Sequence, residues 1–169
     1  MSNFVFLFSL SFILFTSSFL HAGGSSIVGP GNPAALFCER DGGVLVRYSI
    51  QQNQSALCDF SNPATNEDSL AAVGQQSYYR WAQKHSIKSI EAYFKSSLKK
   101  NQTESESSII QYCEQSEGAI TLVKIHSNDK NLLLCEFSDH SQIDALTLFR
   151  GHEHLKNFNL SGKLLTKRN

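Results

Sequence analysis

Two cysteine-bearing segments of this chain repeat each other, and this repetition limits its possible folds more than any other feature. Residues 57–61 (LCDFS) recur as residues 134–138 (LCEFS), and residues 37–39 (FCE) recur as residues 112–114 (YCE). An aromatic residue followed by arginine also occurs later in each half of the chain. Because the motifs keep the same order, the sequence predicts two tandem copies of one small unit.

The four cysteines are predicted to form one disulfide within each copy, Cys38 with Cys58 and Cys113 with Cys135. Four cysteines allow three pairings, and the repeat favours this one. Each bond would close a loop of roughly twenty residues and stabilise a small domain by about 3 kcal/mol. A zinc site with four cysteine ligands is the alternative, but zinc ligands usually come in close C-x-x-C pairs, which these spacings lack.

The N-terminus has the composition of an export signal. Residues 1–22 contain no Asp, Glu, Lys or Arg, and residues 4–20 are mainly apolar. The small residues Ala22 and Gly23 fit a cleavage site, so we expect a signal peptide over residues 1–22. The mature protein would be periplasmic or secreted, in a compartment where disulfides persist. An uncleaved membrane anchor is the alternative, although the apolar run is slightly shorter than a membrane-spanning helix requires.

The first copy has the pattern of a helix followed by a β-hairpin. Asn-Pro at residues 32–33 is typical of a helix start, and Gly-Gly at residues 42–43 ends the same helix. Apolar and polar residues then alternate over residues 44–50, as they do in a half-buried strand. Residues 55–60 are predicted to return as the second strand of the hairpin.

The second copy repeats this pattern, with a helix that opens at residues 107–108 and strands at residues 119–125 and 132–137. A helical segment with the aromatic-arginine pair is expected after each hairpin, at residues 69–83 and 142–151. We therefore expect an α+β fold of two tandem copies, each a helix plus an antiparallel β-hairpin followed by a helical segment and stapled by one disulfide. The expected segments are a signal peptide (1–22), a first repeat unit (32–85), a helical and polar linker (86–106), a second repeat unit (107–153) and a basic C-terminal tail (154–169).

The motifs of the first copy resemble a known bacterial family. Residues 32–39 (NPAALFCE), Gly-Gly at 42–43, residues 57–60 (LCDF) and residues 78–80 (YYR) are similar to the small exported domain called domain-of-unknown-function family 333, whose members often carry a hemolysin label. The second copy is similar more loosely, over residues 107–151. The resemblance implies an exported, disulfide-stapled bacterial protein and supplies no catalytic residue. Many members have a further cysteine pair near the last aromatic-arginine segment, which this chain lacks.

The charge balance argues against nucleic-acid and membrane partners. Lys and Arg together number 15, as do Asp and Glu, so the formal net charge is zero. A neutral chain has no overall field that would gather nucleic acid or an anionic membrane onto its surface. We therefore expect no nucleic-acid partner and no membrane contact after signal cleavage.

The sequence has none of the common local motifs of an enzyme. It lacks a Gly-x-Ser-x-Gly elbow, a phosphate-binding glycine loop and a His-Glu-x-x-His helix, and its cysteines are assigned to disulfides. His152-Glu153-His154 is the tightest group of possible metal ligands, but alternate residues on a helix do not share a face. We therefore expect no cofactor and no metal, and we favour a protein that is not an enzyme.

The candidate binding residues are Tyr78, Tyr79, Arg80 and Trp81, because Tyr, Trp and Arg most often anchor protein interfaces. They predict a small exported module that binds another protein, such as an inhibitor of a hydrolase or an envelope or host-directed factor. The alternative function is a small secreted hydrolase with a histidine and a carboxylate between the two repeats.

The aromatic-arginine pairs also have a structural interpretation, because the pair recurs as Phe149-Arg150. In that case the aromatic ring packs under the hairpin, and the arginine pairs with a carboxylate such as Glu39 or Glu114.

Overall fold

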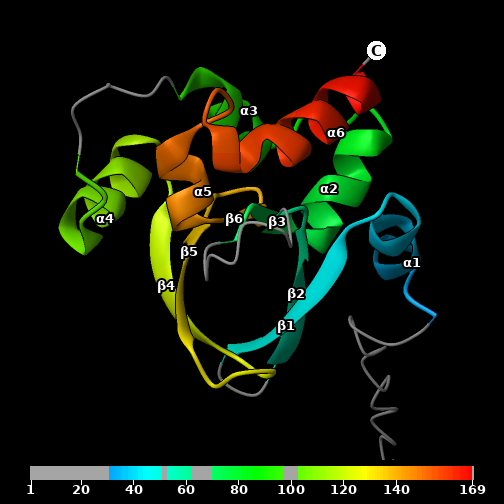
Figure 1. Cartoon of the computed structure of the whole chain (residues 1–169), viewed down its shortest axis with the longest axis horizontal. Helices are drawn as coiled ribbons and strands as arrows, with labels where there is room; N and C mark the ends of the chain where they lie inside the picture. Colours follow the sequence, from blue (N-terminus) through cyan, green and yellow to red (C-terminus); the bar gives the residue numbers. More distant parts are fainter. Residues whose placement is uncertain (1–30, 51–52, 62–69, 97–102, 169) are drawn as a thin grey trace, which may run out of the picture.

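The structure, a computed structural model, describes residues 31–50, 53–61, 70–96 and 103–168 (Figure 1). The predicted signal peptide lies outside these residues. The first half contains α1 (Pro33–Arg40), β1 (Val44–Ile50), β2 (Asn53–Asp59), β3 (Ala72–Gly74), α2 (Gln75–Ala82) and α3 (Lys88–Lys95). The second half contains α4 (Glu106–Gln115), β4 (Ala119–Ile125), β5 (Asn131–Glu136), β6 (Gln142–Asp144), α5 (Ala145–Arg150), the 3-10 helix η2 (Leu155–Asn157) and α6 (Phe158–Arg168).

Helix α1 begins and ends where the sequence predicts. The Asn32 side chain accepts a hydrogen bond from the Ala34 N–H at 2.9 Å, and Pro33 occupies the first turn, where a helix needs no N–H from it. After Arg40 the chain turns through Gly42, whose φ of 84° is in the left-handed region that favours glycine.

Both expected disulfides are present, Cys38–Cys58 and Cys113–Cys135. Each joins the helix that opens its half to the second strand of the following hairpin, and all four sulfur-bearing side chains are fully buried. The half-chains are therefore stapled helix to strand.

The strands do not remain in two separate hairpins. They close into one antiparallel barrel in the order β1-β2-β3-β6-β5-β4, an arrangement that the expected pair of tandem hairpins did not include. Strand β1 pairs with β4 through Tyr48 opposite Ile125, and β3 pairs with β6 through Val73 opposite Ile143. An isolated hairpin would leave two edges unpaired, and closure removes them.

The short strands β3 and β6 lie where the sequence predicted only helix. Each has three residues and runs directly into a helix, and side chains across the seam bind the backbone of the other half. The Ser77 hydroxyl accepts from the Gln142 N–H at 3.0 Å, and the Thr147 hydroxyl accepts from the Ala72 N–H at 3.1 Å. The same type of contact thus holds both sides of the seam.

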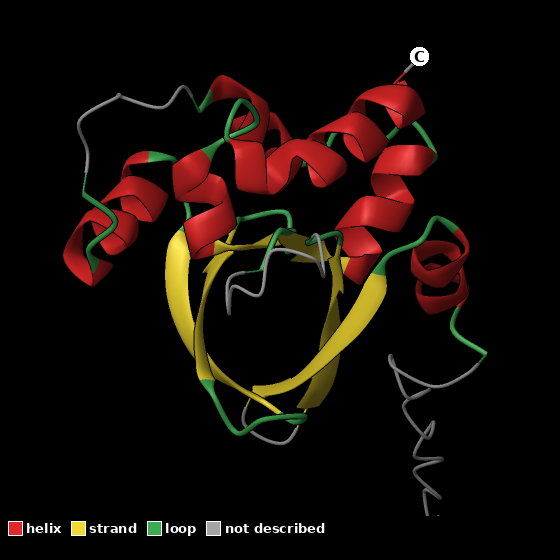
Figure 2. Ribbon diagram, viewed as in Figure 1, coloured by secondary structure: helices red, strands yellow, loops and turns green. Residues whose placement is uncertain are grey.

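Alternating side chains of the strands build two hydrophobic clusters. The inward-facing set fills the barrel and consists of Tyr48, Leu57, Ala72, Val123 and Leu134. The outward-facing set, which includes the disulfides, packs under the helices. Figure 2 shows most of the helices gathered at one end of the barrel.

The predicted linker and tail both contribute to this larger cluster. Helix α3, within the expected linker, buries Ile90 and Tyr93, and α6, within the expected tail, buries Leu160 and Leu164. Helix α3 packs on α5, and α6 packs on α2, so the last helix of each half contacts the other half. Within the described residues, no helix combines the length and apolar character needed to cross a membrane.

Candidate functional site

Tyr78 and Trp81 were predicted to form an exposed patch, and the structure places both in the core. Tyr78 is 0% exposed and Trp81 is 7% exposed. The Tyr78 ring packs against Phe60, with centroids 5.1 Å apart, and its hydroxyl donates to Asp41 Oδ2 at 2.7 Å. Burial, followed by the contact with Asp41, raises the Tyr78 pKa.

Trp81 connects α2 to the last helix of the chain. Its indole N–H donates to the Leu164 carbonyl of α6 at 2.9 Å, and its ring lies 6.1 Å from that of Phe94. Since Tyr78 and Trp81 are three residues apart, they share the helix face that points inward. Neither residue is available for an exposed binding patch.

Tyr79 and Arg80 are half-buried and have different roles. Tyr79 meets Phe37 of α1 edge-on at 5.6 Å, in the way that Phe149 meets Tyr112 of α4 at 5.8 Å. Arg80 donates to the Asp139 carbonyl at 3.4 Å. Both aromatic rings are thus packing residues, as the structural interpretation expected. They pack on the opening helix of each half, however, and not under the hairpin.

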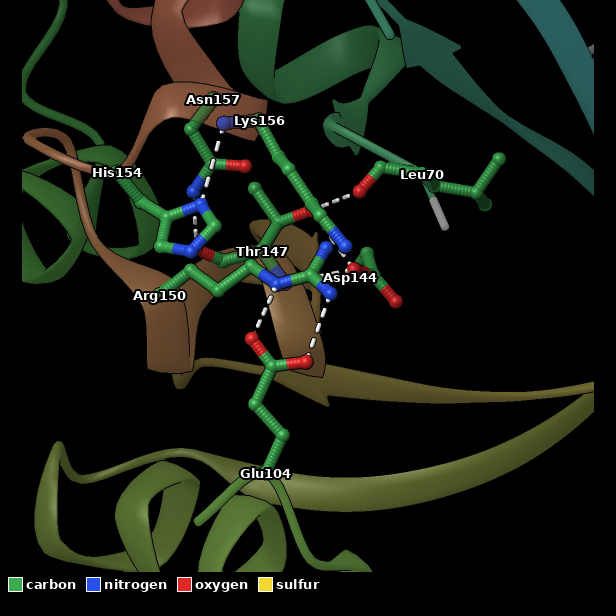
Figure 3. Close-up of polar contacts among 8 residues, drawn as sticks. All are labelled: Leu70, Glu104, Asp144, Thr147, Arg150, His154, Lys156 and Asn157. Atoms are coloured by element: carbon green, nitrogen blue, oxygen red, sulfur yellow. Dashed lines mark hydrogen bonds and ion pairs between the residues drawn. The ribbon is translucent and has the colours of Figure 1, made fainter. Parts of the chain in front are cut away.

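The arginine partners were not Glu39 or Glu114. Arg150, whose side chain is 2% exposed, binds Glu104 through two hydrogen bonds of 2.8 Å, from Nε and Nη2 (Figure 3). This contact holds the Glu104 pKa below its usual value. The sequence could not predict the pair, because Glu104 lies in the segment that was expected to be a linker.

The exposed surface that includes Tyr79 is a groove between α1 and α2, called here the α1–α2 groove. Its volume is about 450 Å³. Leu36 is 52% exposed, and together with Phe37 and Tyr79 it gives the groove a mainly apolar lining. The lining residues are Pro33, Leu36, Phe37, Arg40, Tyr79, Ala82 and Gln83.

Basic groups flank this apolar surface. The Arg40 guanidinium lies 4.8 Å from the centre of the Phe37 ring, and the Lys167 ammonium lies 5.0 Å from it. Lys167 also pairs with Asp41 at 2.9 Å, and Lys84 donates to the Lys167 carbonyl at 2.7 Å. Partial burial alone would raise the Asp41 pKa, but the Tyr78 hydroxyl and Lys167 bring it below the usual value.

The second half has polar residues at the corresponding positions. Leu36 stands two residues before Cys38, and Gln111 stands two residues before Cys113. Ala82 stands two residues after Arg80 in the first half, and His152 stands two residues after Arg150 in the second half. The apolar groove is therefore a feature of the first half.

A second group of functional interest surrounds Asp144, which is fully buried at the start of α5 (Figure 3). Its Oδ2 accepts from the Thr147 N–H at 2.7 Å and lies 2.7 Å from the Thr147 hydroxyl. Burial raises the Asp144 pKa to about 6. The hydrogen bonds from Thr147 and the charge of Arg150 lower this pKa, whereas the charge of Asp59 raises it further. No sequence pattern indicates this site, since an aspartate at this position is typical of an ordinary helix cap.

The predicted hydrolase would need a histidine oriented by a carboxylate. Ser49 and His126 form a serine-histidine pair between β1 and the end of β4, with Oγ 2.6 Å from Nε2. Among the described residues no carboxylate contacts His126, so the third member of a catalytic triad is missing from this arrangement. His152, Glu153 and His154 belong to no group of three or more metal-ligating side chains in the described part of the chain.

Comparison with models of protein families, with curated proteins and with solved structures finds no match to this chain. The resemblance to family 333 therefore stays a prediction.

Proposed function

We propose that this protein is an exported binding module that captures an extended acidic segment of another protein. The α1–α2 groove would take one apolar side chain of that segment, and the basic groups around it would pair with the flanking carboxylates. The observation on which the proposal rests is the exposed apolar groove flanked by cations, on a chain whose overall charge is zero.

The charge around the groove indicates an acidic partner. Helices α1, α2 and α6, together with residue 41 after α1 and residue 84 after α2, have more basic than acidic side chains, and Asp41 is already engaged by Lys167. The basic members are Arg40, Arg80, Lys84, Lys163, Lys167 and Arg168, and the acidic members are Glu39 and Asp41. Complementary charge favours encounter with an acidic segment and disfavours a basic one.

The surroundings of the groove are rigid, which lowers the entropy cost of binding. The Cys38–Cys58 disulfide ties α1 to β2, and Tyr78 ties α2 to Asp41 at the end of α1. Trp81 fixes α6 beside α2. A partner would thus meet a surface that is already ordered.

We also propose where the protein acts and how its two halves arose. Two disulfides fit an exported protein, and residues 1–22 have the composition of a signal peptide. The recurring order of one helix, three strands and one helix supports descent of the two halves from one repeated unit of the family 333 type. A module of this kind would act as an inhibitor of a hydrolase or as an envelope or host-directed factor.

Selection from a random peptide library on phage tests the proposal, with the full precursor expressed for export and the purified, oxidised product as bait. We expect enrichment of sequences with one large apolar residue flanked by Asp and Glu, and loss of that enrichment in 0.5 M salt, because salt screens exposed charges.

Leu36→Gln installs the residue that the second half has at the matching position, and it should abolish the enrichment without unfolding the protein. Gln111→Ala is the matched control on α4 and should leave the enrichment unchanged. The absence of an acidic consensus, or an equal consensus with Leu36→Gln, would overturn the proposal.

A further inference from the structure

A second cavity lies at the edge of the barrel where β5 extends beyond β6. Strand β6 pairs with β5 only from Leu134 to Glu136, so Asn131 to Leu133 continue without a β6 partner. The cavity beside this edge has a volume of about 480 Å³, within the range of small-molecule pockets of roughly 300–1,000 Å³.

The walls of this cavity are mainly aliphatic. Ile109 of α4, Leu133 of β5 and Leu146 of α5 contribute to it, and Leu122 of β4 lies at its exposed side. The rim includes one acidic residue, Glu106, and one basic residue, Lys130.

Asp144 is the buried polar group of the cavity. It is 2% exposed yet belongs to the cavity lining. Both contacts from Thr147 end on Oδ2, so Oδ1 is the oxygen that a ligand would meet. Arg150 lies close enough to lower the Asp144 pKa, while its Nε and Nη2 bind Glu104.

This combination selects for one kind of ligand. A buried carboxylate is costly unless a cation or hydrogen-bond donor meets it, and aliphatic walls favour an apolar body. An ammonium group at Oδ1 would satisfy the first requirement, and a short hydrocarbon or aromatic body against Ile109 and Leu133 would satisfy the second. An anionic ligand would be repelled by Asp144 and Glu106.

We propose that the cavity at the β5 edge binds a small amphiphilic amine, with the ammonium group on Asp144 and the apolar body against α4 and β5. This site lies apart from the α1–α2 groove, and it does not depend on the proposed protein partner. The raised pKa of Asp144 agrees with the proposal, since a carboxylate buried among aliphatic side chains gains most from a cationic ligand.

Calorimetric titration of the full exported protein with three matched probes tests the proposal. The probes are 2-phenylethylamine, its neutral analogue 2-phenylethanol and the anion 3-phenylpropionate. At pH 7.5 we expect saturable binding of the amine, binding of the alcohol about tenfold weaker or more, and no binding of the anion, in keeping with the strength of a charge-assisted hydrogen bond.

Asp144→Asn keeps the cap acceptor and removes the charge, so it should weaken amine binding about tenfold while alcohol binding stays the same. Glu114→Gln removes one negative charge elsewhere on α4 and should change neither. Leu122→Lys introduces a cation at the cavity mouth, at a position that is 62% exposed and thus tolerant of change, and it should also weaken amine binding. Equal amine affinity in wild type and both cavity variants, equal affinity for the amine and the alcohol, or no amine binding to the wild type would overturn the proposal.

Discussion

Gly43 and Gly118 let each disulfide lie against the strand that follows the opening helix. A Cβ atom at Gly118 would lie closer than 3.0 Å to both Cys113 and Cys135 sulfurs, and the same holds at Gly43 for the first disulfide. The sequence predicted Gly43 as part of a helix end. The role of both glycines, to leave room for the sulfur atoms, follows only from the structure.

Gly118→Ala should therefore destabilise the protein by about 1–3 kcal/mol, the usual cost of overpacking a core. Gly162→Ala is the control, because a Cβ atom there meets nothing within 4 Å and alanine is the better helix former by about 1 kcal/mol. Urea unfolding of the oxidised proteins measures both changes. If Gly118→Ala unfolds at the same urea concentration as the wild type, the close approach of disulfide and backbone is wrong.

Asp144 makes stability depend on pH in an identifiable window. Its pKa is about 6 in the folded protein, and an aspartate in an unfolded chain titrates near 3.9. Between these values the folded protein binds more protons than the unfolded chain, so this residue's contribution to stability falls as pH rises from about 4 to 6. Above pH 6 the contribution is lost.

We expect Asp144→Asn to become more stable than the wild type as pH rises, with a difference that grows by about 2 kcal/mol between pH 4 and pH 7. Asparagine keeps an oxygen that can accept from the Thr147 N–H, so the helix cap remains. Unfolding free energies across this pH range test the prediction, and Asp129→Asn at an exposed turn controls for the loss of one negative charge. A constant difference between wild type and Asp144→Asn would contradict the assigned pKa.

Among single residues, the sequence predicted the cysteine pairs and the Asn32 cap, because both depend on local motifs. It misplaced Tyr78 and Trp81, since helical spacing shows that two residues share a face without showing which face is buried. Their partners, Asp41 and Leu164, come from other elements.

At the scale of elements, β3 and β6 decide how the two hairpins join. Each has three residues, too short for an alternating pattern to be recognised, and each runs directly into a helix. The sequence therefore assigned both segments to helix. The long strands β1, β2, β4 and β5 were predictable because seven or six residues show the pattern clearly.

Thr147→Val should weaken the seam between β3 and β6. The change removes the hydroxyl that accepts from the buried Ala72 N–H, and an unsatisfied buried donor costs about 1–3 kcal/mol. Thr166→Val, the same chemical change at an exposed position of α6, is the control and should cost less. Thermal and urea unfolding compare the two variants, and equal losses would show that the seam contact adds no stability.

At the scale of the whole molecule, the strands of both halves form one closed barrel, and the last helix of each half packs on a helix of the other half. The sequence pattern suggested two units, because each half contains its own helix, hairpin and disulfide. It could not show that β1 pairs with β4 or that α6 packs on α2, since such contacts leave no local pattern in the chain.

Neither half should fold alone. A fragment that ends at Ser96 lacks β4 and β6, which pair with β1 and β3, and a fragment that starts at Thr103 lacks β1 and β3. We expect each fragment to show no cooperative thermal transition by circular dichroism, in contrast with the full chain. A cooperative transition in either fragment would show that the halves are independent domains.

The most direct test of the proposed binding surface is nuclear magnetic resonance of the ¹⁵N-labelled, oxidised protein titrated with the nonapeptide DEDEFEDED. We expect amide shifts that gather on α1 and α2, around Leu36, Arg40 and Ala82, and that are absent for DEDEAEDED and for Leu36→Gln. Shifts centred on α4 and α5, or none at millimolar peptide, would contradict this expectation.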